Sequence, residues 1–337
     1  MSEDKFLDGK RVLFLGYEHY DYCTHIRMAL KKAGAIIDYF PVMKYRTGGE
    51  KLLYTFLRNI STKLFLDYNR AYGRSILKKT RNRQYDYILV ILGFQLPNDF
   101  YMELRRRNPK TIFLSYQWDS VKKTVYGNTI LDVIPFFDKV YSFDRKDCET
   151  YENLHYLPLF YTERYEQLRK DSSNIPHDIE LLFIGSLCQY RRYHYVKEIE
   201  RLCSAQGVRF FHYLNVSVRF YFRSLLKGCK LSKVHFKPLS QKEIIEYYKR
   251  SKVIIDLPQQ LQTGLSMRVF EVLGAGKKLI TANSSIVREP FYDEENISII
   301  DPNNLSLDID FIKSADTNWN SKLEDYSIST WMKNLFS

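Results

Sequence analysis

Residues 252–283, KVIIDLPQQLQTGLSMRVFEVLGAGKKLITAN, decide the fold of this chain. The stretch opens with a short apolar run over 252–257, which is typical of a strand buried in a parallel sheet. Residues 266–276 then have helical periodicity and end at two glycines, and 277–283 return to a strand pattern. Strand, helix and strand in this order predict a βαβ unit with parallel strands.

The same stretch carries polar side chains where the first strand gives way to the helix. In a helix that begins near Ser266, Arg268 and Glu271 share one face. A carboxylate accepts hydrogen bonds from paired sugar hydroxyls, and Gly264 before the helix would expose backbone amides to a phosphate. We therefore expect a ligand with hydroxyls and negative charge, and the alternative is a plain ion pair between Arg268 and Glu271.

Outward from this stretch, strands and helices alternate along the whole chain. A capping pair, Ser240 with Glu243, marks one helix start. The polar segment 169–178 is typical of a linker. Strands are predicted at 11–16, 35–41, 85–93, 111–119, 137–144, 155–161, 179–186, 208–214, 234–239, 252–257, 277–283 and 295–301, and helices at 24–34, 50–83, 98–109, 192–207, 219–228, 240–251 and 266–276.

This order predicts an α/β protein with two Rossmann-like, doubly wound parallel-sheet domains. We expect an N-terminal domain over residues 1–168, a C-terminal domain over 169–315, and a tail over 316–337 that packs back on the N-terminal domain. Open parallel sheets bind ligands at the carboxyl ends of their strands. Two facing sheets would therefore form one central cleft.

Composition narrows the class of partner without choosing one. Lys and Arg exceed Asp and Glu by 51 to 39, a net charge of +12, which attracts polyanions such as nucleic acid, anionic lipid or phosphorylated substrates. The five cysteines form no CxxC pair, so neither a disulfide framework nor a zinc site is expected, and a reducing cytoplasm fits best. No signal peptide and no apolar run of about 20 residues is visible, so the protein is soluble or sits on a membrane surface.

The stretch TGLSMRVFEVLGAGKKLITAN, followed by EPFYDEENISIID, resembles the C-terminal signature of GT-B glycosyltransferases. The variety is the one found among bacterial lipopolysaccharide and capsule gene products (family 1-like, CgeB-like). The resemblance implies a helix that presents Glu271 to the ribose of a nucleotide sugar. Retaining members often carry a Glu-x7-Glu pair whose first carboxylate touches the donor sugar, and Thr263 stands at that first position, so the stereochemistry of transfer stays open.

The segment IGSLCQYRR (184–192) resembles the phosphate loop of the same family, and shorter pieces of the N-terminal half resemble its polysaccharide-assembly members. Such proteins neutralise the leaving diphosphate with basic side chains and helix N-termini, so no metal and no cofactor are expected. The donor-binding residues implied by the loop and the C-terminal signature are Gly185, Ser186, Arg191, Arg192, Thr263, Gly264, Leu265, Ser266, Arg268, Glu271 and Lys278.

Glycosyl transfer with inversion needs a base for the acceptor hydroxyl. Carboxylates and histidines that follow predicted strands are the candidates: Asp119 first, beside Trp118, and then Glu18 and His19. Each has a plainer interpretation, an N-cap for Asp119 and a loop residue for His19. Asp144 is interpreted as a helix cap.

A membrane surface is the third expected partner, after the nucleotide sugar and a glycan or lipid-linked glycan acceptor. From Arg58 to Arg83 the predicted helix holds eight basic residues and one acid, Asp67, around an apolar stripe. The stripe either lies in an anionic membrane interface or is core covered by long basic side chains. A glycosyltransferase at the cytoplasmic membrane face is the leading hypothesis. The alternatives are a nucleic-acid-binding protein, though no such motif is visible, and a nucleotide-sugar epimerase.

Overall fold

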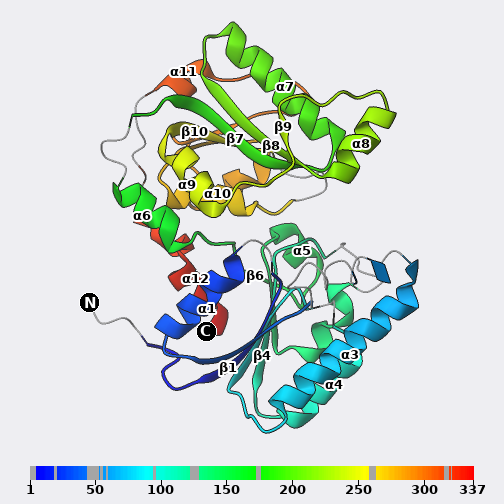
Figure 1. The fold of residues 1–337 in the computed structure, drawn as a ribbon. Helices are drawn as coiled ribbons and strands as arrows, with labels where there is room; N and C mark the ends of the chain where they lie inside the picture. The colour runs from blue at the N-terminus through cyan, green and yellow to red at the C-terminus, as the bar shows by residue number, and fades with distance from the viewer. Residues whose placement is uncertain are drawn as a thin grey trace. The chain divides into compact units, whose positions relative to one another are not determined.

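The computed structural model describes residues 5–18, 21–43, 53, 56–57, 60–93, 96–121, 129–171, 176–257, 263–314, 319 and 321–337. The chain divides into two compact units, Met1–Leu159 with Ile328–Ser337, and Phe160–Ser327. Each unit is a parallel six-stranded sheet with helices packed on it, so the predicted α/β class with two Rossmann-like sheets is confirmed (Figure 1).

The first unit is built on a sheet of order β2-β1-β3-β4-β5-β6, with every neighbouring pair parallel. Its inner strands are buried because apolar residues such as Phe14, Leu89 and Phe113 fill both faces. The strands are β1 (Arg11–Gly16), β2 (Ile36–Pro41), β3 (Tyr87–Ile91), β4 (Ile112–Gln117), β5 (Lys139–Ser142) and β6 (His155–Tyr156).

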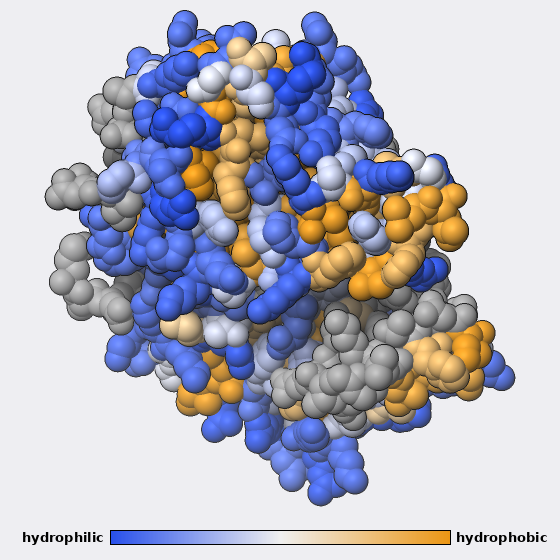
Figure 2. Space-filling model, turned by 45° about the horizontal axis from the view of Figure 1, so that its top comes forward, coloured by the Kyte–Doolittle hydropathy of each residue, from blue (hydrophilic) through white to orange (hydrophobic). Residues whose placement is uncertain are grey.

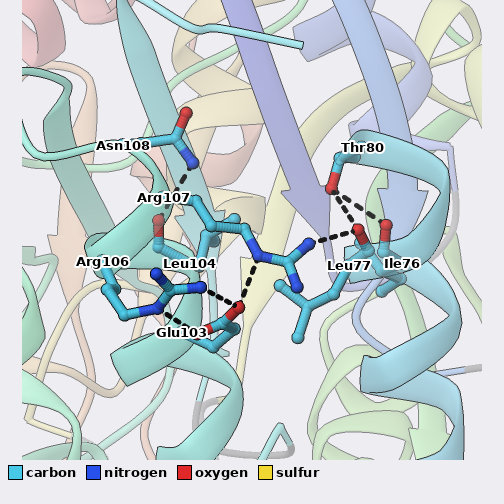
Figure 3. Close-up of polar contacts among 8 residues, drawn as sticks. All are labelled: Ile76, Leu77, Thr80, Glu103, Leu104, Arg106, Arg107 and Asn108. Atoms are coloured by element: carbon cyan, nitrogen blue, oxygen red, sulfur yellow. Dashed lines mark hydrogen bonds and ion pairs between the residues drawn. The ribbon is translucent and has the colours of Figure 1, made fainter. Parts of the chain in front are cut away.

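Helices cover the first sheet on both faces: α1 (Tyr22–Lys32) lies beside α12 (Ile328–Phe336), and α3 (Thr62–Thr80) lies beside α4 (Asn98–Arg107) (Figure 1). The short helix α5 (Arg145–Thr150) follows β5, and Asp144 caps it by accepting from the Lys146 amide, as predicted. Figure 3 shows Arg107 of α4 reaching the last turn of α3, where its Nη1 donates to the Leu77 carbonyl oxygen at 2.8 Å.

The second unit repeats the plan with a sheet of order β12-β11-β10-β7-β8-β9. Its core gathers strand residues such as Leu181 and Val253 against Val196 and Ile199 of α7. The elements are α6 (Glu163–Asp171), β7 (Ile179–Leu187), α7 (Tyr190–Ala205), β8 (Phe210–Val216), α8 (Val218–Leu226), β9 (Val234–His235), α9 (Gln241–Lys249), β10 (Ser251–Asp256), α10 (Met267–Gly274), β11 (Lys278–Thr281), β12 (Ile297–Ile299) and α11 (Ile309–Lys313).

The division of the chain differs from the boundaries expected from the sequence. Helix α6 packs against α9 and α10, so the second unit begins at Phe160 instead of residue 169. The second difference is at the C-terminus, where only Ile328–Ser337 belongs to the first unit, instead of the whole predicted tail over 316–337. The preceding turn stays with the second unit because the Tyr326 ring packs against Phe270 and Phe291, with ring centroids 5.7 and 4.9 Å away.

The apolar stripe of the predicted 50–83 helix divides into two parts. Helix α3 begins at its N-cap Ser61, and Phe65 and Ile76 are buried in the first unit, so this part of the stripe is core. Leu64 is half-exposed, and Phe56 and Ile60 are each 60% exposed. No helix among the described residues is both long and apolar enough to cross a bilayer.

Candidate functional site

The candidate site lies where the strand order of the second sheet reverses, between β7 and β10. Both strands are parallel there, with Val253 paired to Leu181, and ligands of doubly wound sheets bind outside the carboxyl ends of strands at such a switch point. Arg192 joins the two strand ends, because its Nη1 donates to the Ser186 carbonyl at 2.9 Å and its Nη2 to the Leu257 carbonyl at 2.6 Å. Burial lowers the pKa of Arg192, and the nearby Arg268 lowers it further.

Asp256 ends β10 and supplies a buried carboxylate to this edge; the side chain is 4% exposed. Ser266 donates its hydroxyl to Asp256 Oδ1 at 2.9 Å, and Thr281 donates to Oδ2 at 3.5 Å. Burial raises the pKa of Asp256, and the charges of Arg268 and Arg192 with the Ser266 hydrogen bond act against that rise. One carboxylate therefore faces two guanidinium groups.

Arg268 and Glu271 sit on α10 with their side chains turned into the unit. Glu271 is 8% exposed and accepts a hydrogen bond from Tyr248 Oη of α9 at 3.5 Å. Burial lowers the pKa of Arg268, but interactions with Tyr248, Glu271 and Asp256 raise it above its ordinary value. Among the described residues the buried Nη1 of Arg268 has no hydrogen-bond partner, so a donor is left over for an anion.

Polar side chains that follow β11 hold the loop before α10 in place. Asn283 Nδ2 donates to the carbonyl oxygens of Thr263 and Gly264, both at 3.2 Å, and Ser285 Oγ donates to the Thr263 carbonyl at 3.0 Å. Asn283 Oδ1 in turn accepts from the Ser285 amide and hydroxyl. The backbone that leads into α10 is therefore fixed from the side, and Leu265 is buried beneath it.

The N-terminus of α10 offers its amides without a side-chain cap. The N-cap residue is Ser266, whose hydroxyl is directed to Asp256, and the first turn contains no acidic residue. Uncapped amides and the helix dipole favour an anion at such an end. With Arg268 and Arg192 nearby, the edge is suited to a phosphate group.

Three of the predicted donor residues do not present a side chain at this edge. Gly185 lies inside β7, paired to Leu214, and the space that a Cβ would need is taken by the Phe183 ring, 2.8 Å away. Arg191 points to Asn303, whose Oδ1 accepts at 2.6 Å. Lys278 begins β11, at the opposite end of the strand from Thr281; it is buried and bonds to Ser314 and to the Phe311 carbonyl. The exposed Ser186 takes part through its carbonyl.

The catalytic candidates of the first unit follow β1 and β4. Glu18 is exposed after β1 and accepts a hydrogen bond from the Tyr39 hydroxyl. Burial raises the pKa of Tyr39, and the neighbouring Cys23 and the hydrogen bond to the Glu18 carboxylate add to the rise. Asp119 follows β4 and accepts from the Ser120 amide at 3.1 Å. The Trp118 ring lies 6.3 Å from that of Tyr22, which begins α1.

His19 falls outside the described residues. The sequence interpretation missed Asp256, Tyr248, Thr281, Asn283 and Ser285. Asp256 carried a usable signal, because a lone acid at the end of an apolar strand lies at the ligand-binding edge of a parallel sheet. The other residues carried no such signal. Among the described residues, no group of three or more His, Cys, Asp or Glu is placed to hold a metal ion.

Comparison with solved structures gives the fold a name. An E. coli trehalose-6-phosphate protein bound with UDP-2-fluoro glucose matches with a TM-score of 0.62 and 11% identity, over 97% of this chain and 98% of the other. HepE from Anabaena, in complex with UDP and glucose, matches with a TM-score of 0.54 and 12% identity, over 86% and 85%. AviGT4, a glycosyltransferase involved in avilamycin A biosynthesis, gives 0.54 and 10%, over 97% and 96%.

These likenesses extend over both units, as in the GT-B fold, and at such identities they concern the fold alone. No protein-family model matches the sequence, and no curated protein matches it.

Proposed function

We propose that this protein is a glycosyltransferase that moves a sugar from a nucleotide-activated donor to a hydroxyl of a glycan or lipid-linked glycan. One observation carries the proposal: the uncapped N-terminus of α10 meets Arg268 and Arg192 at the switch point of the second sheet. A nucleotide sugar carries a diphosphate, and its negative charge would bind the two arginines and the uncapped amides at this edge. The GT-B fold, found also in structures that hold UDP, supports the same reading.

In the proposed reaction the acceptor oxygen bonds to the anomeric carbon of the donor sugar while the bond from that carbon to the diphosphate oxygen breaks. The bonding electrons leave with the nucleoside diphosphate. Arg268 and the first amides of α10 stabilise this developing negative charge. Asp119 or Glu18 takes the acceptor proton if the transfer inverts the configuration. Glu271 accepts hydrogen bonds from the ribose hydroxyls. The leaving group is neutralised by the protein without a metal ion.

The proposed setting is the assembly of a bacterial surface polysaccharide such as O-antigen, lipopolysaccharide or capsule, at the cytoplasmic face of an anionic membrane. The motif resemblance and the excess of 51 basic over 39 acidic residues support this setting.

A thermal-shift screen with UDP-, GDP-, dTDP-, CMP- and ADP-sugars tests the donor. A ligand present at about 100 times its Kd should stabilise the protein by about 2.7 kcal/mol. No shift with any of the five classes would contradict the proposal. Breakdown or isomerisation of the donor without an acceptor would favour the epimerase alternative, and tight oligonucleotide binding with no response to nucleotide sugars would favour the nucleic-acid alternative.

Exchange of Glu271 for Gln tests the assignment of the ribose. Glu271→Gln keeps the size of the side chain and removes its charge, so the hydrogen bonds to two hydroxyls weaken and nucleotide affinity should fall about tenfold. Calorimetric titration measures the change. Glu198→Gln changes a partly exposed residue of α7 that forms an ion pair with Arg201; it is the matched control and should bind like the parent. Equal affinities for all three proteins would remove Glu271 from the site.

A further inference from the structure

Helix α8 of the second unit presents apolar side chains to solvent. Leu226 is 89% exposed, and Val218, Phe222 and Leu225 are 57, 59 and 40% exposed. Phe236 is 55% exposed and packs beside the helix, with its ring 5.2 Å from that of Tyr221. Figure 2 shows hydrophobic side chains gathered on the right of the view, where Figure 1 places α8. The α8 patch is here Val218, Phe222, Leu225, Leu226 and Phe236.

The patch is a continuous stripe on a helix that is otherwise firmly folded into its unit. With 3.6 residues per turn, the four helical members fall within a sector of about 100°. On the other side Ser224 is buried and Phe220 packs on the core. The Ser217 hydroxyl caps the helix by accepting from the Phe220 amide at 3.2 Å. The core therefore does not use the exposed stripe.

The segment of sequence that contains the patch is basic. Residues 201–242 contain nine Lys and Arg and no Asp or Glu. Arg219 and Arg223 follow the edge of the stripe, and both are exposed. Within the described part of the chain no hydrogen bond or ion pair engages either guanidinium group, whereas the exposed Arg201 of α7 pairs with Glu198.

We propose that the α8 patch docks on an anionic lipid bilayer, with α8 lying in the interface plane. An apolar face inserts at the boundary between headgroups and acyl chains while flanking arginines meet anionic headgroups. A nucleic acid fits less well, because the aliphatic Val218, Leu225 and Leu226 give no stacking platform for bases. The inference rests on the proposed function in one respect, which is that the proposed transfer takes place at an anionic membrane. Binding of the α8 patch to the bilayer requires no nucleotide sugar.

Vesicle co-sedimentation of the full chain tests the proposal, with phosphatidylcholine vesicles with and without phosphatidylglycerol. The parent should bind the anionic vesicles and lose binding at high salt. Phe222→Ser combined with Leu226→Ser should weaken binding at least about tenfold, since two large apolar side chains no longer insert. Arg219→Gln and Arg223→Gln should each weaken it about fivefold.

Met102→Ser is the matched control, because Met102 is 61% exposed on α4 beside basic residues; it should bind like the parent. The proposal is overturned if the parent binds no anionic vesicle, if the Phe222 and Leu226 double variant binds as the parent does, or if Phe56→Ser with Ile60→Ser removes all binding by itself. A random oligonucleotide that binds more tightly than the vesicles would also overturn it. The thermal shifts that nucleotide sugars cause in the α8 variants should equal those of the parent. This measurement separates failure of the membrane proposal from failure of the proposed glycosyl transfer.

Discussion

Arg268 is the cation with which two carboxylates of the candidate site interact, because Asp256 and Glu271 both raise the pKa of its buried guanidinium group. The sequence predicted Arg268 and Glu271 correctly as neighbours on one helix, which depends only on helical spacing. Asp256 was missed because its partners, Ser266 and Thr281, are ten and 25 residues away in the chain and meet it only in the folded sheet. Lys278 was predicted as a donor-binding residue from the family resemblance, and in the structure it begins β11 at the end opposite Thr281.

Arg268→Gln should destabilise the ligand-free protein by about 3 kcal/mol, because removing one partner leaves buried carboxylates without their counter-charge. Urea unfolding at neutral pH measures the loss. Arg201→Gln removes an exposed, ion-paired arginine of the same unit and should leave stability nearly unchanged. An Arg268→Gln variant as stable as the parent would show that the buried charges are compensated by other groups.

At the scale of elements, every predicted strand is present, because short apolar runs between turn signals are strong local patterns. Their lengths were less predictable: β6 and β9 hold only two residues each, since sheet-edge pairing depends on neighbours that the local sequence does not describe. Contacts between helices were also invisible. Figure 3 shows one, in which Arg107 bridges Glu103 of its own helix α4 and the Leu77 carbonyl of α3.

Glu103 makes this helix contact sensitive to acid. Hydrogen bonds from Arg106 and Arg107 lower the pKa of Glu103 from 4.5 to about 2. A depressed carboxylate pKa contributes stability that is complete above the unfolded value and is lost as the pH falls toward the folded value. Glu103→Gln should therefore lower the Tm by about 1 °C near neutral pH, and the gap should close between about pH 4.5 and 2. A gap that is constant with pH would contradict an ionic origin.

At the scale of the whole molecule, the sequence indicated two α/β halves because the strand–helix pattern restarts after a polar segment. It also predicted a tail over residues 316–337 that packs back on the N-terminal domain, and in the structure the chain leaves the second unit at Ser327 and Ile328–Ser337 belongs to the first. That return is held by Trp331, which is 2% exposed and lies 4.9 Å from the Tyr116 ring of β4. Such a contact between residues far apart in the sequence leaves no local pattern.

Trp331→Ala tests whether the two units carry separate tasks. Loss of this buried ring should destabilise the first unit by about 3–5 kcal/mol. The proposed donor residues all belong to the second unit, so nucleotide affinity measured well below the melting temperature should stay within about twofold of the parent. Asn334→Ala, an exposed change on the same helix, controls for α12 itself. Retained affinity would agree with donor binding by the second unit alone. A Trp331→Ala protein that folds but no longer binds nucleotide would contradict this and would mean that the first unit also holds the donor.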